Sequence, residues 1–202
     1  VDIDFKGIDG DNWEGVKRGI YTRISELYSR YWEEVREVID EEEKKIYKQI
    51  IKREPWDVDI VLSLKRLIEY LERTYKEKVI VLIDEYDAVM VKMYGREGFE
   101  SCMRMFKLMY ENALKGNDSL HKALMTGIMR VAKEGMFSGL NNVSVYTVLS
   151  ERFSKHFGFL EEEIEDVLKE EGLSLEETKK YYNGYKFGNN LIYNPWSITN
   201  LL

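Results

Sequence analysis

"VIVLIDEYDAVM", residues 79–90, is the stretch that decides the fold. Five apolar residues, most of them β-branched, run directly into Asp84, Glu85 and, after one tyrosine, Asp87. Such a run is typical of a strand that is fully buried in a parallel sheet. Like charges crowded at the end of a buried strand repel one another and lose hydration, so they need a cation or another partner. The stretch therefore raises the question of what these carboxylates hold.

Length and composition indicate an ordinary folded protein. The 202 residues can bury a sizeable core as one domain, or as one domain with a small appendage. The net charge of −7 weighs against sequence-independent binding to nucleic acid. Cys102 is the single cysteine, and His121 and His156 are the only histidines, so a disulfide framework and a Cys- or His-rich metal cluster are excluded. No apolar run approaches the ~20 residues that span a bilayer. We therefore expect a cytoplasmic protein that does not enter a membrane.

Patterns on either side of the opening stretch alternate strands with helices. Residues 1–5, "VDIDF", alternate apolar and acidic side chains and predict a strand. Residues 120–127, "LHKALMTG", predict another buried strand that ends at a glycine. Apolar residues at spacings of three and four predict helices over about 13–38, 61–75 and 99–115. Strands joined by helical crossovers indicate an α/β domain, with a parallel sheet covered by helices on both faces.

The chain is expected to contain two parts and to belong to a longer polypeptide. Residues 1–155 form the α/β core in this interpretation, and residues 156–202 form a mainly helical portion. Asn194 and Pro195 have the residue types of an N-cap and a first helical position, which predicts a helix that continues beyond the chain end. Val1 already lies inside the first predicted strand. We therefore interpret the chain as a piece of something longer.

The carboxylates after the second strand have the pattern of a Walker B element. Ligands of parallel α/β sheets bind beyond the carboxyl ends of the strands. In this interpretation Asp84 approaches the magnesium ion of a bound nucleotide, and Glu85 orients or deprotonates the attacking water. Asp87 is interpreted as the cap of the following helix. The alternative is that Asp84 and Glu85 begin a solvent-facing loop.

A nucleotide site also needs a polar group on a neighbouring strand end. Thr126 lies at the end of the strand predicted at 120–127, and Arg130 comes four residues later. In the nucleotide interpretation Thr126 lies near the γ-phosphate. The alternative makes Thr126 an ordinary turn residue and Arg130 a charge on the surface of a helix.

Several motifs in one order resemble a known family. They are "VIVLIDEYDAV", "ALMTGIMRVAKEGMFSGLNNVSVYTV", "HFGF" followed by an acidic helix, "YYNGYKFG" and "YNPWSI". They resemble the predicted AAA-ATPase-like family of archaea and bacteria, whose members often carry a restriction-endonuclease-like nuclease domain after the ATPase part. The resemblance covers most of the chain from about residue 60 onward.

The resemblance implies a P-loop NTPase core of the additional-strand type, with ATP and Mg²⁺ as cofactors. It implies that Asp84 and Glu85 form Walker B, with Asp84 on the metal, and that Thr126 is the sensor. Arg130 is expected to contact the nucleotide, and Asn141-Asn142 falls in a family motif without an assigned role. AAA-type motors often form rings in which one subunit's arginine completes the neighbour's site. A homo-oligomer and a downstream nuclease domain are thus the expected partners.

The chain departs from the family at the phosphate-binding loop. A P-loop requires a glycine followed by lysine and Ser or Thr, and none of the 14 glycines here is followed by lysine. The Walker A strand, loop and helix are therefore expected upstream of Val1. The 202 residues alone are expected to be inactive as an ATPase.

Two other functions compete with the ATPase interpretation. One is a degenerate NTPase core that acts as a protein-interaction or regulatory module, with aromatic segments such as "YYNGYKF" and "YNPWS" on its surface. Residues Tyr182–Tyr185 of the first segment are interpreted structurally as an Asn-Gly turn. The other is a metal-dependent nuclease that uses Asp84, Glu85 and Asp87. We disfavour it because no lysine lies close to these carboxylates in the sequence.

Overall fold

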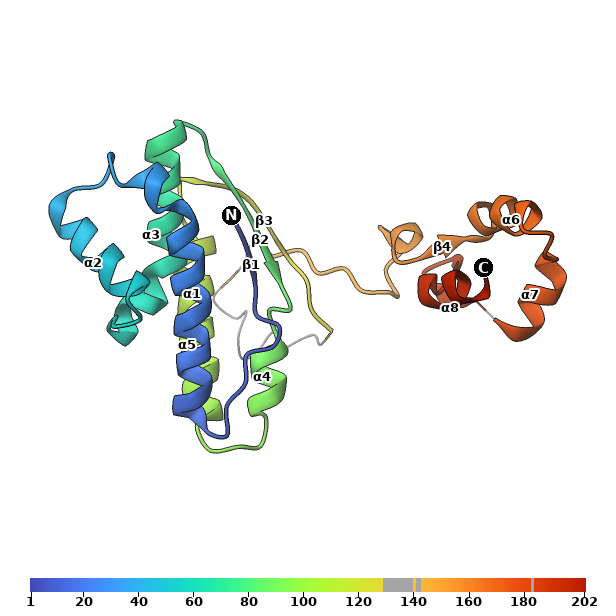
Figure 1. The fold of residues 1–202 in the computed structure, drawn as a ribbon, viewed down its shortest axis with the longest axis horizontal. Helices are drawn as coiled ribbons and strands as arrows, with labels where there is room; N and C mark the ends of the chain where they lie inside the picture. Colours follow the sequence, from blue (N-terminus) through green and yellow to red (C-terminus); the bar gives the residue numbers. More distant parts are fainter. Residues whose placement is uncertain (129–139, 141–142, 183) are drawn as a thin grey trace. The chain divides into compact units, whose positions relative to one another are not determined.

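The computed structural model of the chain describes residues 1–128, 140, 143–182 and 184–202 (Figure 1). These residues form two compact units, Val1–Val143 and Ser144–Leu202. The division expected from the sequence, into an α/β core at 1–155 and a mainly helical portion at 156–202, stays a prediction. No helix among the described residues has the length and apolar character that crossing a membrane requires.

The first unit alternates strands and helices, as the sequence predicts. Its elements are β1 (Asp2–Asp4), α1 (Trp13–Val35), α2 (Glu41–Ile51), α3 (Asp57–Tyr75), β2 (Val79–Asp84), α4 (Ala88–Met93), α5 (Phe99–Leu114) and β3 (Leu120–Met125). The strands form one parallel sheet in the order β1-β2-β3. Asp4 is the register partner of Asp84, and Ile83 is the partner of Met125. The α/β class is confirmed, and the carboxyl ends of the three strands lie side by side.

Local signals in the sequence explain where the helices begin. The Asn12 side chain accepts a hydrogen bond from the amide of Gly15 and caps α1. At the start of α2, Asp40 accepts from the amide of Glu43, whose carboxylate accepts from the amide of Asp40. This capping box satisfies amides that a helix leaves without partners. The charged run from residue 40 therefore begins a helix.

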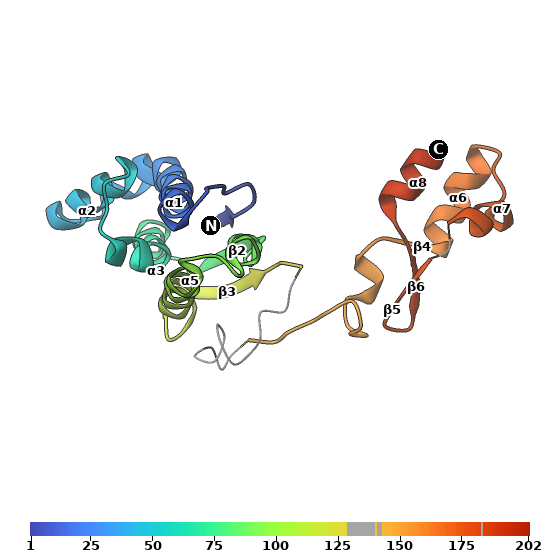
Figure 2. The same ribbon diagram turned by 90° about the horizontal axis from the view of Figure 1, so that it is seen from below.

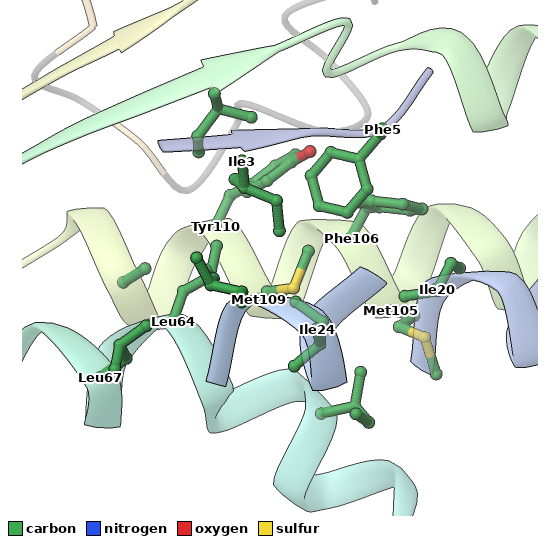
Figure 3. Packing of buried hydrophobic residues seen from close by; sticks show 14 of the residues in the cluster. Ile3, Phe5, Ile20, Ile24, Leu64, Leu67, Met105, Phe106, Met109 and Tyr110 are labelled. Atoms are coloured by element: carbon green, nitrogen blue, oxygen red, sulfur yellow. The ribbon is translucent and has the colours of Figure 1, made fainter. Parts of the chain in front are cut away.

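The core of the first unit lies between the sheet and three helices (Figure 3). Figures 1 and 2 show α1, α3 and α5 gathered on one side of the sheet. Phe5, just after β1, meets Phe106 of α5 edge to face, with ring centroids 5.0 Å apart. Tyr110 on the same helix is also buried against Phe5. Burying one large apolar side chain stabilises a fold by about 1.5–3 kcal/mol, so this interface anchors β1 onto α5.

The opposite face of the sheet is largely exposed, contrary to the expectation from the sequence. On β2, Val81 and Ile83 are 0% and 1% exposed. Their neighbours Ile80 and Leu82 are 52% and 46% exposed. An uninterrupted apolar run predicts burial on both faces only if elements cover both faces. Within the described part of this unit, helices cover one face.

The second unit combines helices with a small antiparallel sheet. Its elements are a 3₁₀ helix (Ser154–His156), β4 (Phe159–Leu160), α6 (Glu161–Glu170), α7 (Leu175–Tyr181), β5 (Tyr185–Phe187), β6 (Asn190–Tyr193) and α8 (Pro195–Leu201). The strands are ordered β4-β6-β5. Asn194 caps α8, as predicted, by accepting from the amides of Trp196 and Ser197. The description as mainly helical missed this sheet because its strands are too short to show a periodic pattern.

Candidate functional site

Asp84 is the last residue of β2, and its carboxylate accepts hydrogen bonds from two other predicted site residues. Its Oδ1 accepts a hydrogen bond from the backbone amide of Glu85 at 2.9 Å. The same oxygen accepts a hydrogen bond from the hydroxyl of Thr126. The structure therefore brings together Asp84, Glu85 and Thr126, although Asp84 and Thr126 are 42 residues apart in the sequence.

Backbone hydrogen bonds fix Thr126 beside Asp84. The amide of Thr126 donates to the carbonyl of Ile83 at 2.9 Å, and its carbonyl accepts from the amide of Tyr86 at 3.0 Å. These bonds extend the pairing of β2 with β3 past the ends of both strands. The backbone of Thr126 is consequently held on both sides, with its hydroxyl beside Asp84.

Glu85 has an unusual backbone conformation. Its φ angle is 51°, in the left-handed region that non-glycine residues rarely adopt. This conformation costs about 1–2 kcal/mol for a residue with a Cβ. It occurs where the chain leaves β2 and turns toward α4. Strain of this kind is concentrated at functional sites, where the surroundings hold the residue in place.

Asp87 is buried beneath this turn. It is 0% exposed and occupies the N-cap position of α4, but its side chain accepts no capping bond from the described residues of that helix. The N-cap position expected from the sequence is therefore confirmed, but without a side-chain capping bond. A Cβ added at Gly127 would lie 2.4 Å from Asp87 Oδ1 and 2.7 Å from the Tyr86 ring. The segments that follow β2 and β3 thus pack against each other at a position that only glycine fits.

A shallow hollow of about 430 Å³ lies on the exposed face of the sheet and extends to Asp84. Its lining residues are Asp2, Ile3, Asp4, Leu82, Ile83, Asp84, Leu124 and Thr126. The hollow has apolar side chains over the strands and oxygen-bearing side chains at the strand ends. Asp2 forms an ion pair with Arg30 at 2.8 Å, and this hydrogen bond lowers the pKa of the Asp2 carboxyl.

Asp4 is a site residue that the sequence interpretation did not assign. It is exposed, lines the hollow and is paired in register with Asp84. One of its oxygens accepts a hydrogen bond from the amide of Lys6 at 2.6 Å. The alternating pattern of "VDIDF" contained the signal, because it put Asp4 at the end of a strand and on the face opposite Ile3.

The oxygen donors at the strand ends suit magnesium better than a softer metal. Mg²⁺ prefers oxygen ligands, and it is usually bound by one or two carboxylates together with substrate phosphates. Among the described residues no cluster of three or more Asp, Glu, His or Cys side chains is placed to hold a metal. The donor set is of the kind that binds Mg²⁺ together with substrate phosphates.

Several predicted positions lie outside the part of the chain that the structure describes, and Cys102 is a core residue. Arg130 and Asn141-Asn142 lie outside the described residues, as does Asn183 of the aromatic loop. Cys102 is buried on α5, where desolvation raises the pKa of its thiol to about 12. A thiol in that state is a poor nucleophile, so Cys102 acts as a core residue.

Comparisons with known proteins assign the chain to a family. Residues 1–137, which include Asp84, Glu85, Thr126 and Arg130, match the family model described as "Predicted AAA-ATPase". A curated relative from Azotobacter chroococcum mcd 1, described as "Uncharacterized protein in vnfD 5'region", is 31% identical over 125 residues. That match covers 60% of this chain but 24% of the relative, so the chain spans about a quarter of the relative's length. No solved structure matches the chain. Because the family model covers more than half of its residues, the chain belongs to the predicted AAA-ATPase family.

Proposed function

We propose that the protein containing this chain binds Mg-ATP and hydrolyses it at the carboxyl ends of β2 and β3. The observation that carries the proposal is the convergence of Asp84, Glu85 and Thr126 at those strand ends, in a member of the predicted AAA-ATPase family. In this proposal Asp84 holds magnesium, directly or through water, and Glu85 acts as the general base toward the attacking water. Bound magnesium would neutralise charge on the phosphates.

The remaining predicted contacts belong to the same proposal. Arg130 is assigned to the nucleotide, although its placement lies outside the described residues. The phosphate-binding loop is assigned to polypeptide outside these 202 residues, because no Gly-Lys pair occurs within them. The exposed apolar face over Ile80, Leu82 and Leu124 supports this assignment, since a parallel sheet normally has elements on both faces. A homo-oligomer and a downstream nuclease domain stay predictions.

The test of the proposal is a comparison of Glu85→Gln with wild type in the complete product of the native gene. Glutamine keeps the size of the side chain but cannot accept the proton of the attacking water. We expect ATP binding by calorimetry to stay within about twofold and hydrolysis to fall by ~10²-fold or more, as for the loss of a general base. Glu97→Gln, an exposed glutamate outside the site, is the matched control. Equal turnover in Glu85→Gln and wild type would refute the role of Glu85.

A degenerate core that serves as an interaction module is the second candidate. Tyr181 and Trp196 in the second unit are strongly exposed aromatic side chains, the type that is enriched in protein interfaces. Calorimetry separates the two candidates. If neither this chain nor the complete gene product binds Mg-ATP, the interaction module becomes the better explanation. If only the complete product binds, the chain is the ATPase portion without its phosphate cradle.

A further inference from the structure

We propose that Thr126 is a positioning residue that orients the carboxylate of Asp84, and that it does not donate a hydrogen bond to the γ-phosphate. This inference rests on the proposed ATPase function and gives Thr126 a narrower role than a sensor. It starts from one observation, which is that the Thr126 hydroxyl already donates to Asp84 Oδ1.

The hydrogen-bonding capacity of a hydroxyl group decides between the two roles. A threonine hydroxyl has one proton to donate and two lone pairs that accept. With its proton on Asp84 Oδ1, the Thr126 hydroxyl has none left for a phosphate oxygen, which at neutral pH is an acceptor. Its lone pairs can still accept a hydrogen bond from water. Thr126 can therefore support Asp84 and contact a water molecule, but cannot at the same time donate to the terminal phosphate.

The same bond determines which oxygen of Asp84 faces a metal. Oδ1 accepts from both the Thr126 hydroxyl and the Glu85 amide, so both of its lone-pair positions are used. Magnesium or a magnesium-bound water would then bind through Oδ2. Hydrogen bonds of this kind fix the orientation of a metal ligand, and their loss typically lowers metal affinity about 10- to 100-fold.

The backbone makes this arrangement rigid. Thr126 is bonded to Ile83 through its amide and to Tyr86 through its carbonyl. These two residues flank the Asp84-Glu85 pair in sequence. Movement of the Thr126 backbone away from Asp84 would break these bonds between the two strand ends. The hydroxyl, which is already bonded to Asp84 Oδ1, is therefore positioned before any ligand arrives, which is what a positioning residue requires.

The test measures metal binding with two nucleotides in the complete gene product. Mn²⁺, which replaces Mg²⁺ and is visible by electron paramagnetic resonance, is titrated in the presence of ADP and, separately, of a non-hydrolysable β,γ-imido ATP analogue. Thr126→Val removes the hydroxyl and preserves the shape, and Thr126→Ser preserves the hydroxyl. Thr74→Val, which removes a hydroxyl bonded to the Tyr70 carbonyl on α3, is the control for the same substitution elsewhere.

If Thr126 is a positioning residue, its substitution should lower the affinity for Mn²⁺ by the same factor with and without a γ-phosphate on the nucleotide. We expect Thr126→Val to weaken Mn²⁺ binding about 10- to 100-fold with both nucleotides. Thr126→Ser and Thr74→Val should remain close to wild type. Nucleotide binding in the presence of EDTA should be equal in all four proteins, and far-ultraviolet circular dichroism should confirm that each is folded.

Two results would overturn the inference in different ways. If Thr126→Val loses Mn²⁺ affinity with the ATP analogue but not with ADP, Thr126 contacts the γ-phosphate. If Thr126→Val keeps its Mn²⁺ affinity with both nucleotides, the bond from Thr126 to Asp84 does not support the metal. Both results leave the ATPase proposal intact. If the wild-type protein binds no Mn²⁺ with either nucleotide, the proposed function fails, and the role of Thr126 fails with it.

Discussion

Glu85 has a left-handed backbone conformation at the point where β2 meets the candidate site. A residue with φ of 51° turns the chain abruptly after Asp84 and leaves the Glu85 amide free to donate to the Asp84 carboxylate. A residue without a side chain would adopt this conformation at no steric cost. In the proposed function, the role of the Glu85 carboxylate as general base offsets this steric cost, as is expected where stability and activity oppose each other.

This strain predicts an order of stability between two substitutions. The free energy of unfolding of Glu85→Gly should exceed that of Glu85→Ala by about 0.5–1 kcal/mol. Glycine removes ~1–2 kcal/mol of steric strain at a left-handed φ. It also loses ~0.4–1 kcal/mol of stability, because glycine makes the unfolded chain more flexible. Urea unfolding followed by circular dichroism measures the difference. At Glu97, which has no positive φ, the same pair should show the reverse order. Alanine proving the more stable residue at both positions would mean that Glu85 is unstrained.

At the scale of elements, the sequence specifies what each strand is but not what surrounds it. The apolar run at residues 79–83 correctly predicts β2, and the acidic residues after it correctly mark the strand end. Burial of both faces was not predictable, because it depends on elements that are separate from the strand. The bond between Thr126 and Asp84 depends likewise on the register of β3 against β2, which no local pattern encodes. The short strands around Asn190 were missed because a hairpin of this length resembles a loop.

The two faces of β2 should respond differently to truncation. Ile83→Ala removes side-chain atoms from the core and should destabilise the first unit by about 2–5 kcal/mol. Leu82→Ala, one residue away on the exposed face, should lower the free energy of unfolding by less than about 1 kcal/mol. Urea unfolding of this 202-residue chain tests the pair, each substitution serving as the control for the other. Similar losses at both positions would show that the second face is covered.

At the scale of the molecule, the two units have very different cores. The large cluster of buried apolar residues lies entirely within residues 1–143. Among the described residues of the second unit, the cluster contains the buried residues Ile164, Leu168, Tyr193 and Ile198. Small cores contribute little net stability after the conformational entropy of the chain is subtracted. The α/β part is therefore the more robust unit, and it carries the candidate site.

The difference in cores predicts the behaviour of a fragment. Residues 1–143 expressed alone should unfold cooperatively in urea, at a midpoint close to that of the α/β part in the 202-residue chain. The fluorescence of Trp13 and Trp32, which pack against the core of that unit, reports the transition. A fragment of residues 144–202 is the comparison and should unfold at lower urea. A fragment of residues 1–143 without a cooperative transition would show that its core depends on the rest of the chain.

The position of β3 in the sheet has a consequence for handling the protein. β3 pairs with β2 along one edge, and in the described part of the chain no strand pairs with its other edge. An edge strand offers a row of amides and carbonyls to any extended polypeptide that meets it. Lys122 is a charge within this strand of the kind that discourages such pairing. We therefore expect concentrated solutions of the isolated chain to form intermolecular β-sheet and to precipitate, and we expect neutralisation of Lys122 to accelerate both.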